Sequence, residues 1–403
     1  MNIPWSLSLR HVRAHWFRNS LTVGAVAVAV FLFCFLVSLI VTLDAQVEEA
    51  SQDRLIVQSA VSLFVDLPLD YQTKISGVAG IEHVTKWQWF GGYYQSPDQG
   101  FFAQFAVDPK PFFDMYKPDV EITEGPEGSP GNDTWNETLQ AMLTEKRGAL
   151  IGKSLAEKWG WKVGDTIPLN CTIFQKSDGS AWDFVILGIF TKKKANVDEN
   201  TLFFRFDYLQ DTMEASDPDF PIGTGTYFIE AKPGLSAQVI GEVDSLFTNG
   251  PQRTKTTTEA AFQQSFVSML GNLPLFLGTI GGAVVFAVFF SVVNAMMISG
   301  RQRIRESGIL KALGFRDGVI GTLIVFESLL ITLLGGLAGI ALAFGSGKGI
   351  QKNLQNFFPN FVVEPKTMIL GLSIAVIMGV IAGITPMLNL MRLRPTDALR
   401  SEG

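Results

Sequence analysis

The chain has 403 residues, of which 47% are hydrophobic and 17% are charged. This composition is too apolar for one ordinary soluble fold and too charged for a chain buried throughout in a membrane. Acidic residues exceed basic ones within residues 44–265, whereas basic residues predominate in the two flanks. An acidic domain between basic membrane flanks argues against a nucleic-acid partner and for a domain translocated across a membrane.

Residues 1–19 form a basic amphipathic segment. Its apolar residues Trp5, Leu9, Val12 and Trp16 recur at helical spacing, and its arginines are interrupted by no acidic residue. This pattern predicts a helix that rests on membrane lipids at the cytoplasmic interface. The uncharged run at residues 20–43 is long enough for a first membrane span.

Residues 44–265 are expected to form one large α+β domain outside the cytoplasm, between the first and second spans. Strand and helix patterns are clearest in its second half, at residues 149–169, 183–190, 201–209 and 227–247. Residues 118–135 are rich in Pro, Gly and acidic residues and are expected to form an exposed loop. The aromatic residues within 87–105 fit either a sheet core or an exposed binding patch.

Three more apolar runs predict membrane spans, at residues 266–300, 318–347 and 367–391. The first of these is longer than one span, so its N-terminal part, up to about Pro274, is expected to project from the membrane. The remaining segments are a basic loop at 301–317, a short outer loop at 348–366 and a basic tail at 392–403. The basic residues place the loop at 301–317 and the tail in the cytoplasm.

The 301–317 loop is itself amphipathic. As a helix, the loop would have apolar residues on one side and charged residues on the others. The apolar residues are Ile304, Ile309, Leu310 and Leu313, and the charged ones include Arg301, Arg305 and Lys311. Gly314 is expected to end the helix. These residues alone leave open whether the loop lies on anionic lipid or docks on a partner protein.

Residues 305–314, RESGILKALG, resemble the R-E-I-G-I-L-[RK]-A-[LI]-G signature of MacB/FtsX-type ABC transporter permeases, with Ser307 in place of the usual Ile. Residues 149–169 and 183–190 resemble the MacB-like periplasmic core domain. Residues 326–339 and 386–400 resemble the family's third span and its C-terminal tail. The resemblance covers both termini, the four spans, the loop and the second half of the outer domain, and it is weakest at residues 60–145.

The resemblance implies a permease subunit in the bacterial inner (plasma) membrane, with four membrane helices and one large α+β extracytoplasmic domain. The loop would be a coupling helix that docks on an ABC ATP-binding subunit through Arg303, Arg305, Glu306, Gly308, Ile309, Leu310, Lys311, Ala312, Leu313 and Gly314. ATP and Mg would bind to that separate chain. A second permease copy or a paralogue would complete a dimer, and a membrane-fusion adaptor protein is a further candidate partner.

In this family, movement of the coupling helices is relayed to the outer domains, which extrude a lipoprotein, lipid, peptide or drug. Two other functions remain open. One is an FtsX-like signalling scaffold that activates a cell-wall hydrolase by the same motion. The other is a membrane-anchored sensor or binding protein without an ATPase, which the match to the coupling helix disfavours.

Glu327 is the one acidic residue inside the predicted spans. A buried carboxylate there needs a partner, so the simplest interpretation pairs it with an arginine or backbone donors near the cytoplasmic end. A role in transmitting motion from the loop into the third span is the alternative, and a proton relay is the least favoured one. The glycine pairs Gly335/Gly339 and Gly379/Gly383 are spaced for close helix packing, which is expected to leave little room for a cavity.

No catalytic, metal-binding or cofactor-binding residues can be assigned on this chain. Residues 148–154, GALIGKS, place three residues between the glycines, whereas a phosphate-binding P-loop needs four. The histidines are scattered without metal-ligand spacing. Cys34 lies in the first span and Cys171 in the outer domain, so no disulfide is expected. The chain is therefore expected not to be an enzyme by itself.

Overall fold

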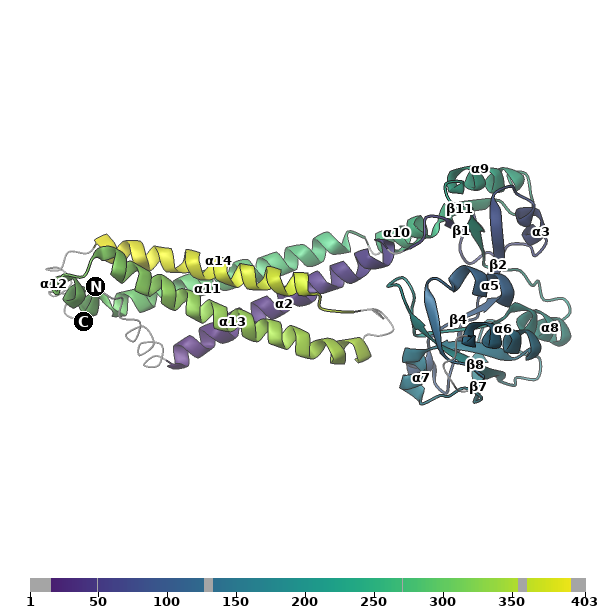
Figure 1. Ribbon diagram of the computed structural model, residues 1–403, viewed down its shortest axis with the longest axis horizontal. Helices are drawn as coiled ribbons and strands as arrows, with labels where there is room; N and C mark the ends of the chain where they lie inside the picture. The colour runs from purple at the N-terminus through teal and green to yellow at the C-terminus, as the bar shows by residue number, and fades with distance from the viewer. Residues whose placement is uncertain (1–15, 49, 127–132, 270, 354–360, 393–403) are drawn as a thin grey trace. The chain divides into compact units, whose positions relative to one another are not determined.

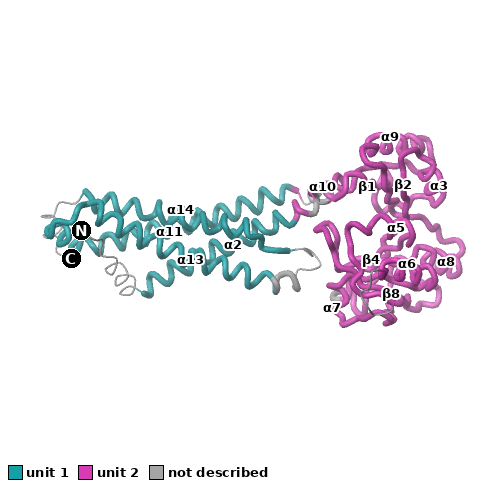
Figure 2. Tube along the Cα trace, in the orientation of Figure 1, with its two compact units in different colours: residues 1–42, 272–354, 361–403 teal, residues 43–271, 355–360 magenta. Residues whose placement is uncertain are grey.

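The computed structural model describes residues 16–48, 50–126, 133–269, 271–353 and 361–392 (Figure 1). The chain divides into two compact units (Figure 2). The first unit, here called the helix bundle, takes residues 1–42, 272–354 and 361–403. The second unit, here called the α/β domain, takes residues 43–271 and 355–360. The predicted N-terminal interfacial helix, except for its last residues, and most of the C-terminal tail lie outside the described residues.

Four long helices form the bundle, together with the short helix α12 (Ile304–Ala312). The long helices are α2 (Trp16–Glu48), α11 (Leu273–Gln302), α13 (Asp317–Asn353) and α14 (Pro365–Arg392). Each contains a stretch of 28 to 31 residues that is long and apolar enough to cross a membrane. The predicted four spans, with the large domain between the first and the second, are confirmed.

The predicted second span differs from the observed helices. Residues 266–300 do not form one helix, because α10 (Glu259–Met269) ends before Gly271, whose φ is +72°, and α11 begins at Leu273 with Pro274 in its first turn. A glycine at positive φ and a proline at a helix start are the usual stop and start signals. The part predicted to project is therefore a separate helix, and it belongs to the α/β domain.

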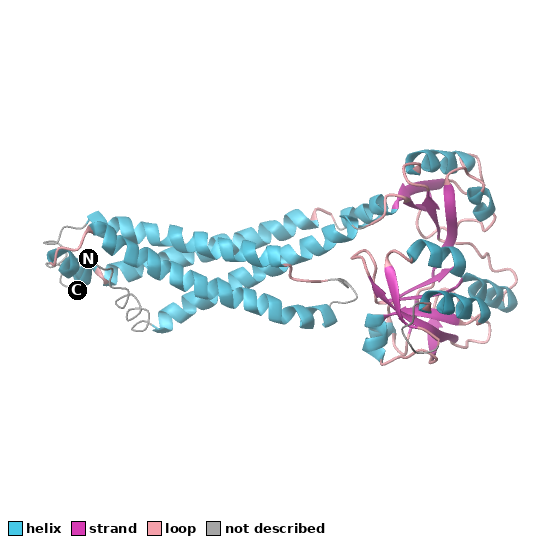
Figure 3. Ribbon diagram, viewed as in Figure 1, coloured by secondary structure: helices cyan, strands magenta, loops and turns pink. Residues whose placement is uncertain are grey.

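The α/β domain is built on one mixed, eleven-stranded sheet (Figure 3). The strands lie in the order β11–β1–β10–β2–β4–β9–β6–β8–β7–β3, and β5 also pairs with β8. The pairs β4/β9 and β6/β8 are parallel, and the others are antiparallel. The strands are β1 (Arg54–Ser59), β2 (Ile81–Trp89), β3 (Gly92–Tyr93), β4 (Ala103–Val107), β5 (Val120–Glu124), β6 (Gly148–Gly152), β7 (Thr166–Cys171), β8 (Trp182–Lys192), β9 (Thr201–Arg205), β10 (Thr226–Ala231) and β11 (Thr254–Thr258).

Helices cover the sheet at both of its ends. In Figure 1, α9 lies beside β1 and β11, while α6, α7 and α8 lie beside the β4 and β8 part of the sheet. The helices are α3 (Tyr71–Ser76), α4 (Pro97–Gly100), α5 (Pro109–Tyr116), α6 (Thr134–Thr144), α7 (Lys153–Trp159), α8 (Phe206–Ser216), α9 (Ser236–Leu246) and α10. Strands such as β10 are therefore buried on both faces, which explains their continuous apolar sequence.

The elements predicted in the second half of the domain are present. Residues 149–169 form β6, α7 and β7, residues 183–190 lie in β8, and residues 201–209 and 227–247 each give a strand followed by a helix. The prediction of a loop at 118–135 was wrong for β5 and for the start of α6, whereas residues 127–132 lie outside the described residues. In β5, Val120 and Ile122 are buried while Glu121 is exposed, and this alternation was masked by the surrounding Pro, Gly and acidic residues.

The aromatic residues of 87–105 mostly pack in the sheet core and do not form an exposed patch. Trp87 stacks on Phe228 with 4.2 Å between ring centroids, and it also contacts Phe112. Phe90 is fully buried, and its ring contacts several other rings of a separate core cluster. Phe101 is the exception, with 44% of its surface exposed.

Phe90 and Phe101 provide a matched pair for testing this core. Phe90→Ala should lower the unfolding free energy of the protein by about 3–5 kcal/mol, because it leaves a cavity among packed rings, whereas Phe101→Ala should cost about 1 kcal/mol or less. The measurement is denaturant unfolding of the full-length protein in detergent, monitored by its tryptophan fluorescence. Equal losses for the two variants would contradict this description of the core.

Candidate functional site

The predicted coupling segment forms α12 at one end of the bundle. Its C-terminus is closed by Gly314, whose φ is +86°. The Gly314 N–H donates to the Lys311 carbonyl over 3.0 Å, and the Phe315 N–H donates to the Leu310 carbonyl over 3.1 Å. This pair of hydrogen bonds is the Schellman arrangement, which needs a residue that tolerates a left-handed conformation. Gly314 therefore ends the helix as the sequence predicts.

Two buried cations fasten α12 to its neighbours. The Lys311 ammonium donates to the Met391 carbonyl at the end of α14 over 3.0 Å, and it pairs with Asp317 at the start of α13 over 3.0 Å. Just before α12, Arg303 forms an ion pair with Glu327 in α13. The sequence prediction placed Lys311 away from the apolar side of the helix and among the docking residues, but only 8% of its side chain is exposed, because its two partners lie within the bundle. Displacement of α12 would therefore act directly on α13 and α14.

The opposite side of α12 is uncovered. Ile309 and Leu313 are 45% and 67% exposed, and Arg305, one turn before Ile309, is exposed on the same side. These three residues are spaced four apart and share one helix face, so the exposed face is an apolar pair beside a basic residue. Among the other predicted coupling residues, Glu306, Ala312 and Gly314 are exposed, Leu310 is half-buried and Gly308 is buried.

Ser307, the residue that departs from the family signature, is buried with only 7% of its surface exposed. It lies on the side of α12 that faces the bundle, like Gly308. The smaller side chain therefore changes how the helix packs on its own chain and leaves the exposed face as it is.

Glu327 is paired as the simplest sequence interpretation expected. Its side chain is 2% exposed and that of Arg303 is 11% exposed. The second carboxylate oxygen of Glu327 and the hydroxyl of neighbouring Ser328 have no hydrogen-bond partner within the described parts of the chain. The pair is thus buried and only half satisfied, which is costly in a low-dielectric interior.

The four predicted packing glycines lie where helices approach closely. A Cβ added to Gly339 would lie 2.5 Å from the Ala27 carbonyl oxygen in α2, and one added to Gly379 would lie 2.2 Å from the Thr332 hydroxyl in α13. Added Cβ atoms at Gly335 and Gly383 would likewise lie within 3.0 Å of α2 and α13. Three helices, α2, α13 and α14, are therefore packed backbone to backbone.

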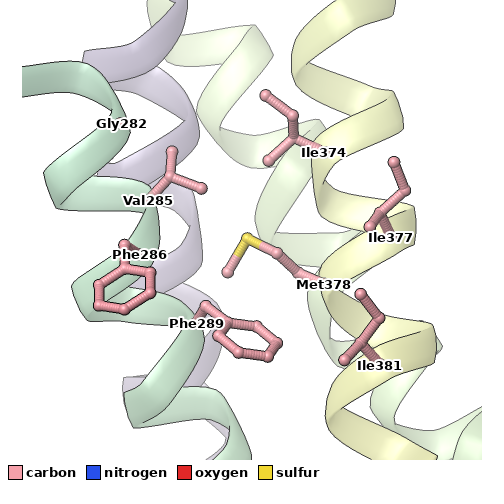
Figure 4. Close-up of a pocket in the computed structure, with 8 residues that line it drawn as sticks. All are labelled: Gly282, Val285, Phe286, Phe289, Ile374, Ile377, Met378 and Ile381. Atoms are coloured by element: carbon pink, nitrogen blue, oxygen red, sulfur yellow. The ribbon is translucent and has the colours of Figure 1, made fainter. Parts of the chain in front are cut away.

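Helix α11 packs less tightly, and a groove of about 360 Å³ opens between it and α14 (Figure 4). The groove is lined by Gly282, Val285, Phe286, Phe289, Ile374, Ile377, Met378 and Ile381. The four packing glycines join α13 to α2 and α14 and none of them lies in α11, so this groove opens away from the contacts where close packing was expected to leave little room for a cavity. No lining side chain is polar, so the groove gives no hydrophilic path.

Glu199, from the segment between β8 and β9, lies against the segment that resembles a P-loop. Gly152 ends β6, and a Cβ added there would lie 2.1 Å from the Glu199 carbonyl oxygen. The Ser154 hydroxyl donates to the Glu199 carboxylate over 3.3 Å. A negative charge beside the loop disfavours phosphate. In the described residues, no group of three or more His, Cys, Asp or Glu could hold a metal ion.

Two family models match the chain. The FtsX-like permease C-terminal model matches residues 278–395, and the MacB-like periplasmic core domain matches residues 20–246, which is more than half of the chain. The chain belongs to the MacB/FtsX-type ABC transporter permeases. Permeases of this type work with ABC ATPase partners, and this permease is a membrane protein with a periplasmic-type domain.

Curated relatives agree with this family. "Uncharacterized ABC transporter permease YvrN" of Bacillus subtilis (strain 168) is 34% identical over 143 residues, covering 35% of this chain and 32% of the relative. "Pyoverdine export ATP-binding/permease protein PvdT" of Pseudomonas savastanoi pv. phaseolicola is 33% identical over 154 residues, covering 38% of this chain and 23% of the relative. The permease thus spans a third or less of the length of these relatives.

Among solved structures, the periplasmic region of MacB from Actinobacillus actinomycetemcomitans matches 55% of this permease and 95% of its own chain. The sequence identity is 8% and the TM-score is 0.37. The likeness is too loose to bear on function.

The contribution of the buried Arg303–Glu327 ion pair to the stability of the protein can be tested. Arg303→Met leaves an unpaired carboxylate and should lower stability by about 3–5 kcal/mol, whereas the neutral double variant Arg303→Met/Glu327→Gln should lie within about 1 kcal/mol of the wild type. The measurement is unfolding of the detergent-solubilised protein. If the double variant were as unstable as Arg303→Met, the pair would not be the source of the loss.

Proposed function

We propose that this permease is the membrane subunit of a bacterial inner-membrane ABC exporter that works by mechanotransmission. ATP binding and hydrolysis on a separate subunit would move α12, the bundle would relay the movement, and the α/β domain on the outer side would expel the substrate. Two permease copies, or this permease and a paralogue, would act together. The printed sequence contains no GxxxxGK[ST] motif, so ATP and Mg are not expected to bind within these 403 residues.

The observation that carries this proposal is the exposed face of α12. An apolar pair at Ile309 and Leu313 stands open on a helix that is otherwise anchored by Lys311 and Arg303. Exposed apolar side chains rimmed by polar ones are typical of protein contacts. Because the anchors join α12 to both α13 and α14, a force on this face would reach two membrane helices at once.

The Arg303–Glu327 pair is proposed to carry the movement into α13. Its unsatisfied carboxylate oxygen can accept a new donor when α12 shifts, so the pair can change partners at small cost. The neutral double variant described above should keep its ATPase rate and lose export. Unchanged export in that variant would exclude the role.

Export is favoured over a hydrolase-activating scaffold by the names of relatives, which refer to export of pyoverdine and of macrolides. The apolar lining of the groove between α11 and α14 supports handling of the substrate by the α/β domain, because a polar substrate would find no path through the spans. An amphiphilic molecule or a lipoprotein fits this arrangement.

Charge placed on the open face of α12 should break docking. Ile309→Asp and Leu313→Glu should each weaken association with the ATP-binding subunit at least about tenfold, because each buries an unpaired carboxylate in the contact. The measurement is co-purification and ATPase stimulation in nanodiscs. Leu246→Glu, on an exposed leucine of the α/β domain, is the matched control and should change neither.

Normal association and stimulation in both α12 variants, with insertion verified, would show that this face is not the docking surface.

A further inference from the structure

A buried cluster of charges ties the two ends of the α/β domain's chain to the middle of its fold. The cluster, here called the Arg54 cluster, consists of Arg54, Tyr116, Asp119, Lys194 and Glu259. Arg54 lies at the start of β1, six residues after α2 ends, and Glu259 begins α10. These are the two places where the chain passes between the α/β domain and the helices that enter the bundle.

Arg54 makes contacts in two directions. One nitrogen of its guanidinium, Nη1, lies 3.1 Å from the Glu259 carboxylate. The other, Nη2, lies 2.6 Å from the Asp119 carboxylate and donates over 3.0 Å to the Met115 carbonyl, near the C-terminal end of α5. The guanidinium carbon also lies 4.1 Å from the centroid of the Tyr116 ring. A planar fork with separate donors suits this bridging, and lysine would not reproduce it.

The other charges complete the cluster. Lys194, just after β8, lies 2.5 Å from the second oxygen of Asp119. The Ser51 N–H, in the segment between α2 and β1, donates over 3.1 Å to Glu259. The side chains of Arg54, Asp119 and Glu259 are each 6% exposed or less. Burial raises the pKa of Glu259, and Arg54 opposes that rise, so loss of Arg54 alone would leave a poorly solvated acid.

The cluster joins parts that the sheet keeps apart. Five strands separate β1 from β8 in the sheet order, and β5 and Lys194 lie at the β8 side. The ion pair between Arg54 in β1 and Asp119, which immediately precedes β5, connects the two sides directly. Displacement at Ser51 or Glu259 would therefore reach the β5–β8 part of the domain through charge contacts as well as through the intervening strands.

We propose that Arg54 is a positioning residue for the transport cycle. It holds the entry and exit segments of the α/β domain, at Ser51 and Glu259, against the β5–β8 part through Asp119. The two segments and the β5–β8 part then move as one body. The role of Arg54 in transport rests on the proposed mechanotransmission. The clamping itself is independent of any ATPase.

The test uses the full-length protein in nanodiscs with spin labels on exposed residues at Gln264 in α10 and Glu121 in β5, in a Cys34→Ala/Cys171→Ala background. Two variants break the clamp. Arg54→Lys keeps the buried charge but has one nitrogen in place of two. Arg54→Met/Asp119→Asn/Glu259→Gln removes the three most buried charges together and leaves only Lys194, which is 39% exposed, without its carboxylate. The control is Lys146→Met/Asp211→Asn, which removes an exposed ion pair of the same domain.

Both clamp variants should fold and should broaden the distribution of distances between the labels at least about twofold, whereas the control should match the wild type. A width unchanged from the wild type in either folded clamp variant would overturn the inference. Should the triple variant fail to fold, Arg54→Lys decides the result alone, because its buried charge stays balanced.

A second pair of labels, at Glu121 and at Thr279 in α11, separates this inference from the proposed function. In the complex with the ATP-binding subunit, ATP and vanadate should shift the wild-type distance, and the shift should be at least halved in Arg54→Lys. No shift in the wild type would contradict mechanotransmission and leave the clamp to be judged by the first pair. A full shift in Arg54→Lys would contradict the role of Arg54 in transport.

Discussion

A charge removed from water has to be paired, and in this permease the pairing of buried charges determines which elements move together. Arg303 and Glu327 join the start of α12 to α13, and Lys311 joins the helix to Asp317 and the end of α14. Leaving Arg303, Glu327 or Lys311 unpaired in a low-dielectric interior would cost several kcal/mol. The α12 segment is therefore mechanically continuous with two membrane helices, although it is only nine residues long.

The glycine contacts give the bundle the stiffness that this arrangement needs. Backbone approaches at Gly339 and Gly379 leave no room for side chains between α2, α13 and α14, so these helices cannot slide past one another without opening a void. Helix α11 is held more loosely and borders an apolar groove. This contrast separates a rigid part of the bundle from a helix that is freer to shift.

Sequence patterns predicted the features that depend on local chemistry. The four spans followed from uninterrupted apolar runs, and the end of α12 followed from Gly314, because both signals lie within a few neighbouring residues. The partner of Glu327 could be predicted only as an arginine or a backbone donor, since several arginines lie within reach in sequence. Strand β5 was missed, because two buried side chains, Val120 and Ile122, are too few to stand out among Pro, Gly and acidic neighbours. The Arg54 cluster could not be predicted at all: its members are separated by up to about two hundred residues, and only the order of strands brings them together.

Mechanotransmission by this permease requires contact between the open face of α12 and an ATP-binding subunit. The decisive measurement is photo-crosslinking in native membranes from an unnatural amino acid at Leu313, compared with one at Leu246. We expect a crosslink to an ABC ATP-binding protein from position 313 and none from position 246. Crosslinking from position 313 to lipid alone, in protein shown to be inserted in the membrane, would contradict contact between α12 and an ATP-binding subunit.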